Sequence, residues 1–185
     1  MMAQFNGFEI NPIHLGDAWK VCNFCVANED RLKRYFPKTL EQNLNPTLSN
    51  YFVESKVKAF ENKDEFLYTL KHSETRELAG LIYLKELNWD TKQGEFAYCI
   101  GYAFEEQGLT SKAIQLLSTH AFEDLGLETL QIIAHKDNLG SVKVALKNDF
   151  KWVKTLVNGF TPTGEAPLDM ELYELVSDSC KVSKT

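Results

Sequence analysis

The spacing of apolar residues changes abruptly at residues 62–64. Before this point they recur mainly at the helical period, and after it they alternate as in β-strands. Three such strands are expected in succession, joined by short polar turns: 66–70, 78–87 and 95–102. Consecutive strands with short connections pair antiparallel. The middle of the chain is therefore predicted to form an antiparallel meander.

The part of the chain before this meander is predicted to be mostly helical. A strand over 5–13 comes first. A helix then covers at least 17–30, with Asp17 as the expected N-cap, and Pro37 stops it. A second helix begins with Asn45 as its cap, because the proline that follows suits the first helical position.

After the meander, helices and strands alternate. Helices are expected over 110–125 and 138–147, with Gly126 at the C-terminal end of the first. Strands are expected between and after them: 127–135, 150–157 and 168–176. The strands before and after the first helix should run parallel, since a helical crossover joins them. We expect one α/β domain with a mixed sheet over 1–176, followed by a polar tail over 177–185.

The composition is that of an ordinary folded protein and argues against some partners. With 185 residues, 44% of them hydrophobic, the chain can bury the core of one domain. Its formal charge of −6 argues against wide contact with nucleic acid and fits a cationic or neutral partner. No apolar run reaches the ~18 residues that span a bilayer, so no membrane contact and a cytoplasmic location are expected.

Four cysteines are present: Cys22, Cys25, Cys99 and Cys180. Cys22 and Cys25 form a C-x-x-C pair in the first expected helix, without the second pair that a zinc site would need. We expect these two thiols to face different sides of the helix. Cys99 lies among apolar strand residues and is expected to be packed. No cluster of metal ligands is recognisable, and no metal is expected.

A glycine-containing turn precedes the helix expected over 110–125. Residues 104–113 read Phe-Glu-Glu-Gln-Gly-Leu-Thr-Ser-Lys-Ala. The first N–H groups of a helix have no partner within the helix, and the helix dipole favours an anion there. Gly108 would let the backbone approach a phosphate closely. Taken alone, the segment is better explained as an ordinary connection between a strand and a helix.

A second motif follows about 30 residues later. The segment from Asn138 to Phe150 reads Asn-Leu-Gly-Ser-Val-Lys-Val-Ala-Leu-Lys-Asn-Asp-Phe. It resembles the N-x-x-S-x-x-V-x-x-K-x-G-F stretch of the GNAT superfamily of N-acetyltransferases, in its RimJ/RimL-like branch. The blocks at 121–127 and 98–102 are similar to that branch as well. The specific resemblance covers 95–152, and the earlier part agrees in the order of its elements.

The turn departs from the Q/R-x-x-G-x-G/A pattern of that branch. Glu105 occupies the first position, Thr110 the last, and Glu106 a position often held by glycine. Asp149 replaces the usual glycine before the final phenylalanine. At about 6 Å, repulsion between two unit charges is roughly 0.7 kcal/mol in water and ~3 kcal/mol at an effective dielectric constant of 20. Both carboxylates would therefore have to point away from a bound pyrophosphate.

The resemblance implies a site for acetyl-CoA as co-substrate. The residues expected to contact it are Gln107, Gly108, Leu109, Thr110, Ser111, Asn138 and Ser141. The resemblance also implies Glu95 as the base that takes a proton from the acceptor amine, and Ser141 as a donor to the leaving thiolate. Simpler roles stay open: Glu95 as a solvated carboxylate at a strand end, and Asn138 and Ser141 as helix caps.

The implied reaction is transfer of an acetyl group from acetyl-CoA to a primary amine by direct attack. No Ser-His-Asp set is recognisable, which argues against a covalent acetyl-enzyme. The first expectation for the acceptor is a protein or peptide N-terminal α-amine. A small amine, such as a polyamine or an aminoglycoside, and a catalytically silent binding module are the alternatives. In the family, the two strands that flank the turn splay apart around the pantetheine arm, and we expect the same separation here. The protein is expected to be a monomer or a homodimer.

Overall fold

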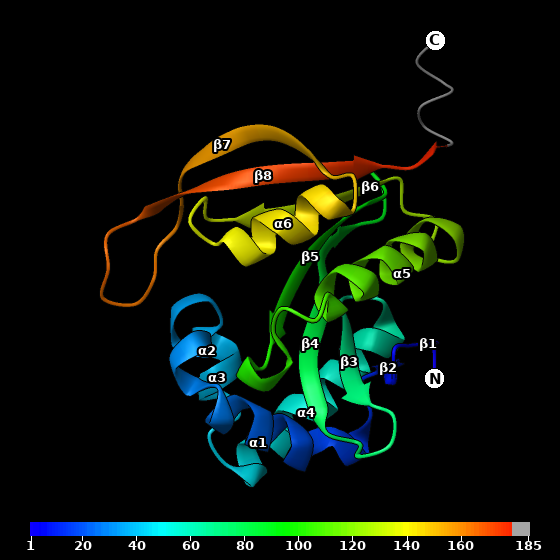
Figure 1. The fold of residues 1–185 in the computed structure, drawn as a ribbon, viewed down its shortest axis with the longest axis vertical. Coiled ribbons are helices and arrows are strands. Elements are labelled where there is room, and N and C mark those ends of the chain that lie inside the picture. The colour runs from blue at the N-terminus through cyan, green and yellow to red at the C-terminus, as the bar shows by residue number, and fades with distance from the viewer. Residues whose placement is uncertain (179–185) are drawn as a thin grey trace. The chain divides into compact units, whose positions relative to one another are not determined.

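The computed structural model describes residues 1–178, which form two compact units (Figure 1). The first unit comprises Met1–Tyr83 and Tyr98–Gln107. The second comprises Leu84–Ala97 and, among the described residues, 108–178. Two strands of the meander pass from one unit to the other, so neither unit is a single continuous piece of chain.

Eight strands are hydrogen-bonded in the order β1-β2-β3-β4-β5-β6-β8-β7. Their bounds are β1 Ala3–Phe5, β2 Phe8–Pro12, β3 Phe66–His72, β4 Leu78–Asn88, β5 Gln93–Ile100, β6 Thr129–Ala134, β7 Lys151–Phe160 and β8 Leu168–Val176. β5 and β6 are parallel, whereas β6 with β8 and β8 with β7 are antiparallel. The expected mixed α/β sheet is confirmed, including the parallel pair on either side of Gly108.

The expected first strand is in fact two strands. β1 and β2 pair antiparallel around a turn at Asn6 and Gly7, both of which have positive φ angles of 48° and 79°. Asn-Gly is a strong signal for a tight hairpin, because both residues tolerate this conformation. The prediction of one continuous strand over 5–13 is therefore wrong, for a reason already present in the local sequence.

The expected first helix is divided in two, α1 Ala18–Ala27 and α2 Glu29–Tyr35, after a short 3-10 turn η1 at Leu15–Asp17. A further short helix that was not expected, α3 Pro37–Glu41, follows. Pro37 does not simply stop a helix but begins α3, since the first helical position needs no N–H donor. Asp17 precedes α1 without capping it through its side chain. Its carboxylate instead accepts a hydrogen bond from the N–H of His14.

The last helix of the first unit, α4 (Pro46–Asn62), packs on α1 and β3. Its start is as predicted, because the Asn45 side chain accepts a hydrogen bond from the N–H of Leu48 at 3.0 Å. Phe60 of α4 meets Phe66 and Tyr68 of β3 edge-on, with ring centroids 4.9 and 5.4 Å apart. Edge-on aromatic pairs of this kind stabilise a core beyond their buried area.

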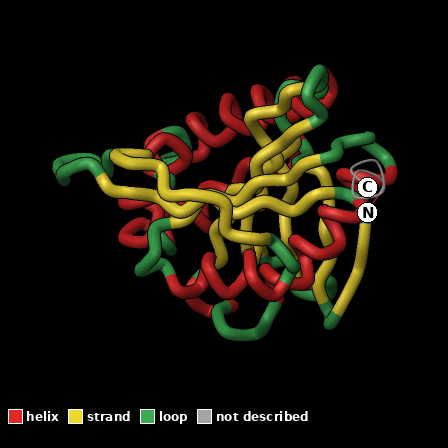
Figure 2. Tube along the Cα trace, turned by 90° about the horizontal axis from the view of Figure 1, so that it is seen from above, coloured by secondary structure: helices red, strands yellow, loops and turns green. Residues whose placement is uncertain are grey.

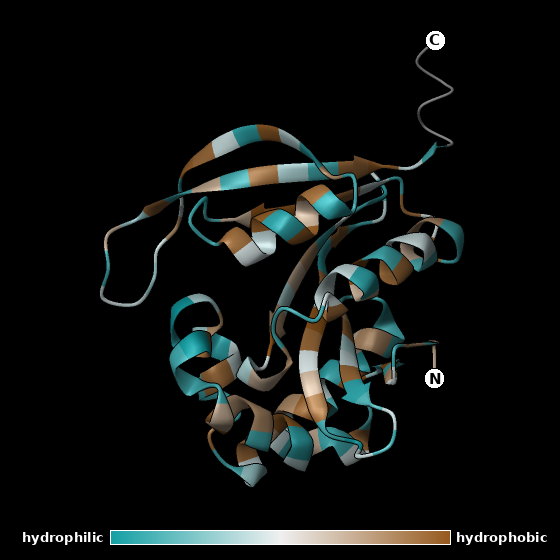
Figure 3. Cartoon of the chain, viewed as in Figure 1, coloured by the Kyte–Doolittle hydropathy of each residue, from teal (hydrophilic) through white to brown (hydrophobic). Residues whose placement is uncertain are grey.

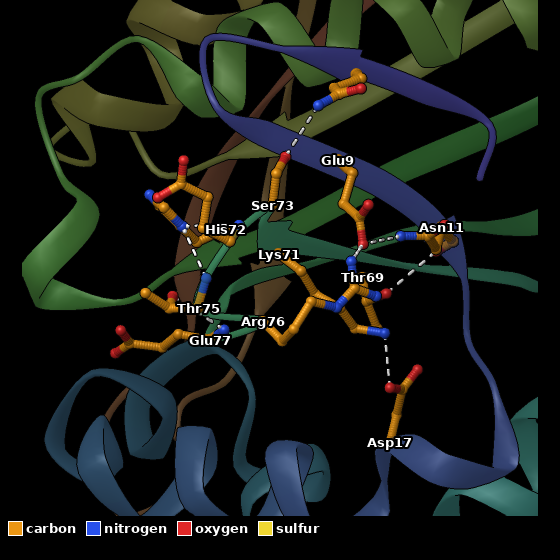
Figure 4. Close-up of polar contacts among 12 residues, drawn as sticks. Glu9, Asn11, Asp17, Thr69, Lys71, His72, Ser73, Thr75, Arg76 and Glu77 are labelled. Carbon is orange, nitrogen blue, oxygen red and sulfur yellow. Dashed lines mark hydrogen bonds and ion pairs between the residues drawn. The ribbon is translucent and has the colours of Figure 1, made fainter.

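A polar network joins β2, β3 and the turn before α1 (Figure 4). The Lys71 ammonium lies 2.6 Å from the Asp17 carboxylate, and the two side chains are only 6% and 5% exposed. Glu9, which faces Lys71 across the β2–β3 pairing, accepts hydrogen bonds from Asn11 and Arg76. Buried charges are tolerated only when paired in this way.

In the second unit, α5 (Leu109–Glu123) contacts α6 (Leu139–Lys147), and α6 contacts β6. Three apolar residues of α5 at helical spacing are fully buried: Ala113, Ile114 and Leu117. Gly126 has a φ angle of 73°, as expected for the glycine that follows a helix. The two helices therefore begin and end close to where their local signals predict.

β7 lies at one end of the strand order, and most of its residues are exposed. Hydrophobic and hydrophilic residues are interspersed along it (Figure 3). Trp152 and Val157 are among its exposed apolar side chains. The loop over 161–167 that joins β7 to β8 is drawn green at the far left of Figure 2.

Cys22, Cys25 and Cys99 are buried free thiols. The expectation that Cys22 and Cys25 face different sides of α1 is wrong, because residues three apart share a helix face. The packed position expected for Cys99 is confirmed. The fourth, Cys180, and most of the predicted tail lie outside the described residues. Within residues 1–178 we find no group of three His, Cys, Asp or Glu side chains suited to a metal ion, and no helix long and apolar enough to cross a bilayer.

Candidate active site

Gly108 is the N-cap of α5 and adopts a left-handed conformation, with a φ angle of 72°. It is exposed, and a Cβ atom built on it would meet nothing within 4 Å. Having no side chain, it leaves the first N–H groups of α5 without a side-chain cap. Leu109 is buried, so only its backbone can face a ligand. The turn thus presents the amides of Leu109, Thr110 and Ser111 where a helix favours an anion.

Ser111 is tied to the end of α6. The side-chain amide of Asn148 donates to the Ser111 hydroxyl oxygen at 3.1 Å and to the carbonyl of Val144 at 2.8 Å. This contact brings together the two motifs recognised in the sequence. Sequence reasoning missed Asn148, because no local signal connects residues that are 37 positions apart.

Asn138 is the N-cap of α6, and its side-chain oxygen accepts a hydrogen bond from the N–H of Ser141 at 3.2 Å. The capping role left open for Asn138 is therefore present. Ser141 contributes its backbone to this cap, which leaves a chemical role for its hydroxyl as a prediction.

The parallel pairing of β5 and β6 runs from Gln93 with Thr129 to Phe96 with Ile132. β6 continues to Ala134, and Ala97 of the second unit still belongs to β5. In the second unit, the hydrogen-bonded pairing of β5 with β6 therefore ends at Phe96 and Ile132, before either strand ends. The expected separation of the two strands agrees with this register.

Glu95 lies one residue before the pairing ends, opposite Gln131. Its side chain is 15% exposed, and its Oε1 atom lies 2.9 Å from the Lys85 ammonium of β4. The reading of Glu95 as a solvated carboxylate at a strand end is therefore wrong. The ion pair engages Oε1 of the carboxylate. Lys85 was not foreseen, because a contact between strands depends on their register.

Glu105 does not stand free beside the turn. The guanidinium of Arg31 in α2 forms an ion pair with it and donates to the carbonyl of Ile100 at 2.8 Å. The Gln107 side chain donates to the carbonyl of Ala103 at 3.2 Å, so it is engaged within the turn. The sequence alone could not show that Arg31 is the partner of Glu105.

Two surface hollows border parts of these segments. The first, about 280 Å³, is lined in the second unit by side chains such as Gln115, Thr119 and Lys147. The second, about 360 Å³, lies in the first unit near Lys20 and Tyr102. Neither includes any residue of the expected cofactor set. The candidate site is therefore described by the backbone amides at the start of α5 and not by either of these hollows.

Residues 8–151 match the family described as Acetyltransferase (GNAT) domain. The chain belongs to this family. The match extends well before the segment that carried the resemblance, and it includes both the turn at Gly108 and the cap at Asn138. The GNAT assignment made from residues 95–152 is confirmed.

Solved structures of acetyltransferases share the fold over nearly the whole chain. The ribosomal-protein-S5-alanine acetyltransferase from Vibrio fischeri superposes with a TM-score of 0.89 at 16% identity, covering 95% of this chain and 96% of that one. RimL, a ribosomal L7/L12 alpha-N-protein acetyltransferase solved with coenzyme A, gives 0.87 at 17% identity, with coverages of 96% and 98%. The spermidine N(1)-acetyltransferase of Escherichia coli (strain K12) is 25% identical over 130 residues, which are 65% of this chain and 70% of that enzyme.

Proposed function

We propose that this GNAT protein binds acetyl-CoA and transfers its acetyl group to the α-amine of a protein or peptide. The observation that carries the proposal is the start of α5, where Gly108 has a φ angle of 72° and no protein atom lies near its missing side chain. An anionic pyrophosphate fits such a start, because the backbone can approach it closely. The structure of RimL with coenzyme A supports this choice of co-substrate.

The transfer we propose is direct. The acceptor nitrogen, in its neutral form, attacks the thioester carbonyl carbon, the C–S bond breaks, and the nitrogen gives up its proton. Glu95 accepts this proton through Oε2, alone or through a water molecule, while Lys85 holds Oε1. The Ser141 hydroxyl is the proposed hydrogen-bond donor that stabilises the departing thiolate, which then takes up a proton from solvent.

An α-amine suits a site with one plausible carboxylate base. Its pKa of about 8 leaves about a tenth of it neutral at pH 7, compared with roughly one lysine ε-amine in 2,500. This difference corresponds to ~3 kcal/mol before any enzyme group acts. The two structural relatives are described as acetyltransferases of a ribosomal-protein alanine and of a protein α-amine, which supports the same choice.

A small polyamine is the second candidate. It is favoured by the likeness to spermidine N(1)-acetyltransferase and by the formal charge of −6. A panel of N-terminal peptides, lysine peptides with blocked α-amines, spermidine and an aminoglycoside, each at equal concentration, separates the two. Release of free CoA thiol is the measurement.

We expect the α-amine peptides to react fastest. A clear rate advantage for spermidine would replace the first candidate by the second. Binding of acetyl-CoA without turnover of any acceptor would instead indicate a catalytically silent module. Light scattering of the same sample would show whether the protein is the expected monomer or homodimer.

A further inference from the structure

Arg31 makes three contacts with the segment that leads into the turn. Its guanidinium pairs with the Glu105 carboxylate and donates to the carbonyl of Ile100 at 2.8 Å. It also lies over the Tyr102 ring, 4.4 Å from the ring centroid. One side chain of α2 thus engages a charge, a backbone carbonyl and an aromatic face within six residues of chain.

A neighbouring residue fastens the same segment. The Asn28 side chain, buried between α1 and α2, accepts a hydrogen bond from the N–H of Tyr102 at 3.0 Å and donates to the carbonyl of Phe24 at 2.8 Å. Gly101 packs so closely that a Cβ atom there would lie 3.3 Å from the Phe24 ring. The position of residues 100–105 is therefore set by the junction of α1 and α2.

The chain itself keeps Glu105 close to the start of α5. Glu105 and Gly108 are three positions apart in the sequence, so their Cα atoms lie within about 11 Å of each other. Glu105 and Glu106 would place two negative charges before a turn that has to accept a pyrophosphate. Arg31 neutralises one of them, at the position where the family pattern has glutamine or arginine.

We propose that Arg31 promotes binding of the co-substrate by neutralising Glu105, so that the start of α5 can accept the pyrophosphate of acetyl-CoA. The proposal rests on the proposed function. Residues 105–108 contain no positive charge, and Arg31 of α2 supplies one. Its effect is on binding of the co-substrate and not on the chemical step.

Isothermal titration with CoA and steady-state kinetics test this on the full chain. We expect Arg31→Ala to raise the CoA dissociation constant and the KM for acetyl-CoA about tenfold, with kcat at saturation within about twofold. The effect should shrink as salt screens the unpaired Glu105 carboxylate. Arg34→Ala, on the same short helix, is the matched control and should leave the dissociation constant unchanged.

Removal of the carboxylate separates a charge effect from a scaffolding effect. Arg31→Ala combined with Glu105→Gln should bind CoA within about threefold of the wild type, and Glu105→Gln alone should bind at least as tightly as the wild type. The single variant keeps Arg31 and remains informative if Arg31→Ala does not fold.

A double variant as weak as Arg31→Ala, insensitive to salt, would overturn the proposal, and so would weaker binding by Glu105→Gln. Wild-type binding that Arg31→Ala does not change would overturn this inference and leave the proposed function standing. A folded wild-type protein that binds no CoA would remove both.

Discussion

Glu95 and Lys85 meet across β5 and β4, and their roles can be separated by changing each partner. If Glu95 is the base, Glu95→Gln should lower kcat at least tenfold and leave the CoA dissociation constant unchanged, because the carboxylate acts on the acceptor proton. Lys85→Met removes the ion pair but keeps the carboxylate, and it should retain most of the activity. The measurement is initial rate against pH from 6 to 9.

Equal losses of activity and of thermal stability in both variants would mean that the pair is structural. Wild-type rates for Glu95→Gln over the whole pH range would make Glu95 a bystander.

Gly108 is expected to tolerate asparagine better than alanine. A Cβ atom would meet no protein atom, so the cost of a substitution comes from the φ angle of 72°. The left-handed region costs most L-residues roughly 1–2 kcal/mol, and asparagine less. Gly108→Ala should therefore lower the free energy of unfolding by about that amount, and Gly108→Asn by clearly less. Urea titration of both variants checks this, and identical stabilities would contradict it.

The link between the turn η1 and β3 depends on the buried pair of Asp17 and Lys71. Loss of one partner leaves an uncompensated charge in the core, so Asp17→Ala should lower the free energy of unfolding by about 3–5 kcal/mol. The exposed pair of Lys92 and Glu128 is the control, and Glu128→Ala should cost at most about 1 kcal/mol. Chemical denaturation compares them. Similar losses in the two variants would show that burial does not govern the cost.

At the scale of elements, the sequence predicted best where a local signal sets a boundary. Asn45 before a proline, the glycine at 126 and the strand over 168–176 were all placed correctly. The Asn-Gly hairpin was a local signal that was overlooked. The division of the first helix at Asn28 was not predictable in this way, because the Asn28 side chain bonds Tyr102, 74 positions later.

In the candidate site, too, sequence predicted the features that depend on local signals. The glycine at the start of α5 and the cap of α6 could be recognised from residue types and short spacings. The partners of Ser111, Glu95 and Glu105 could not, since each contact joins separate elements and depends on strand register or helix packing. Sequence therefore supplied the candidate residues but did not show how their charges are balanced.

For the whole molecule, we expect stability to fall as the pH rises above about 9. Burial raises the pKa of the Cys99 thiol from 9.0 to about 12, and burial also raises the pKa of Cys25. Between pH 9 and 12 the unfolded chain therefore loses thiol protons that the folded protein retains. The unfolded state is favoured by up to about 1.4 kcal/mol per pH unit for each thiol, and the contribution is fully present below pH 9.

Denaturant titrations at pH 8 to 11 measure this slope. Cys99→Ala should show a shallower decline than the wild type, because one of the thiols is absent. Equal slopes in the two proteins would show that the pKa of Cys99 is the same in the folded and the unfolded state.

β7 has a hydrogen-bonded neighbour on one side only. Along such a strand, amides directed at β8 alternate with amides directed at solvent. In deuterated buffer the outward amides should exchange without any opening of the structure, whereas the inward ones exchange only when the β7–β8 hairpin separates. The outward amides of β7 thus serve as the reference for the inward amides of the same strand. The ratio of their exchange rates gives the free energy of opening of the β7–β8 hairpin.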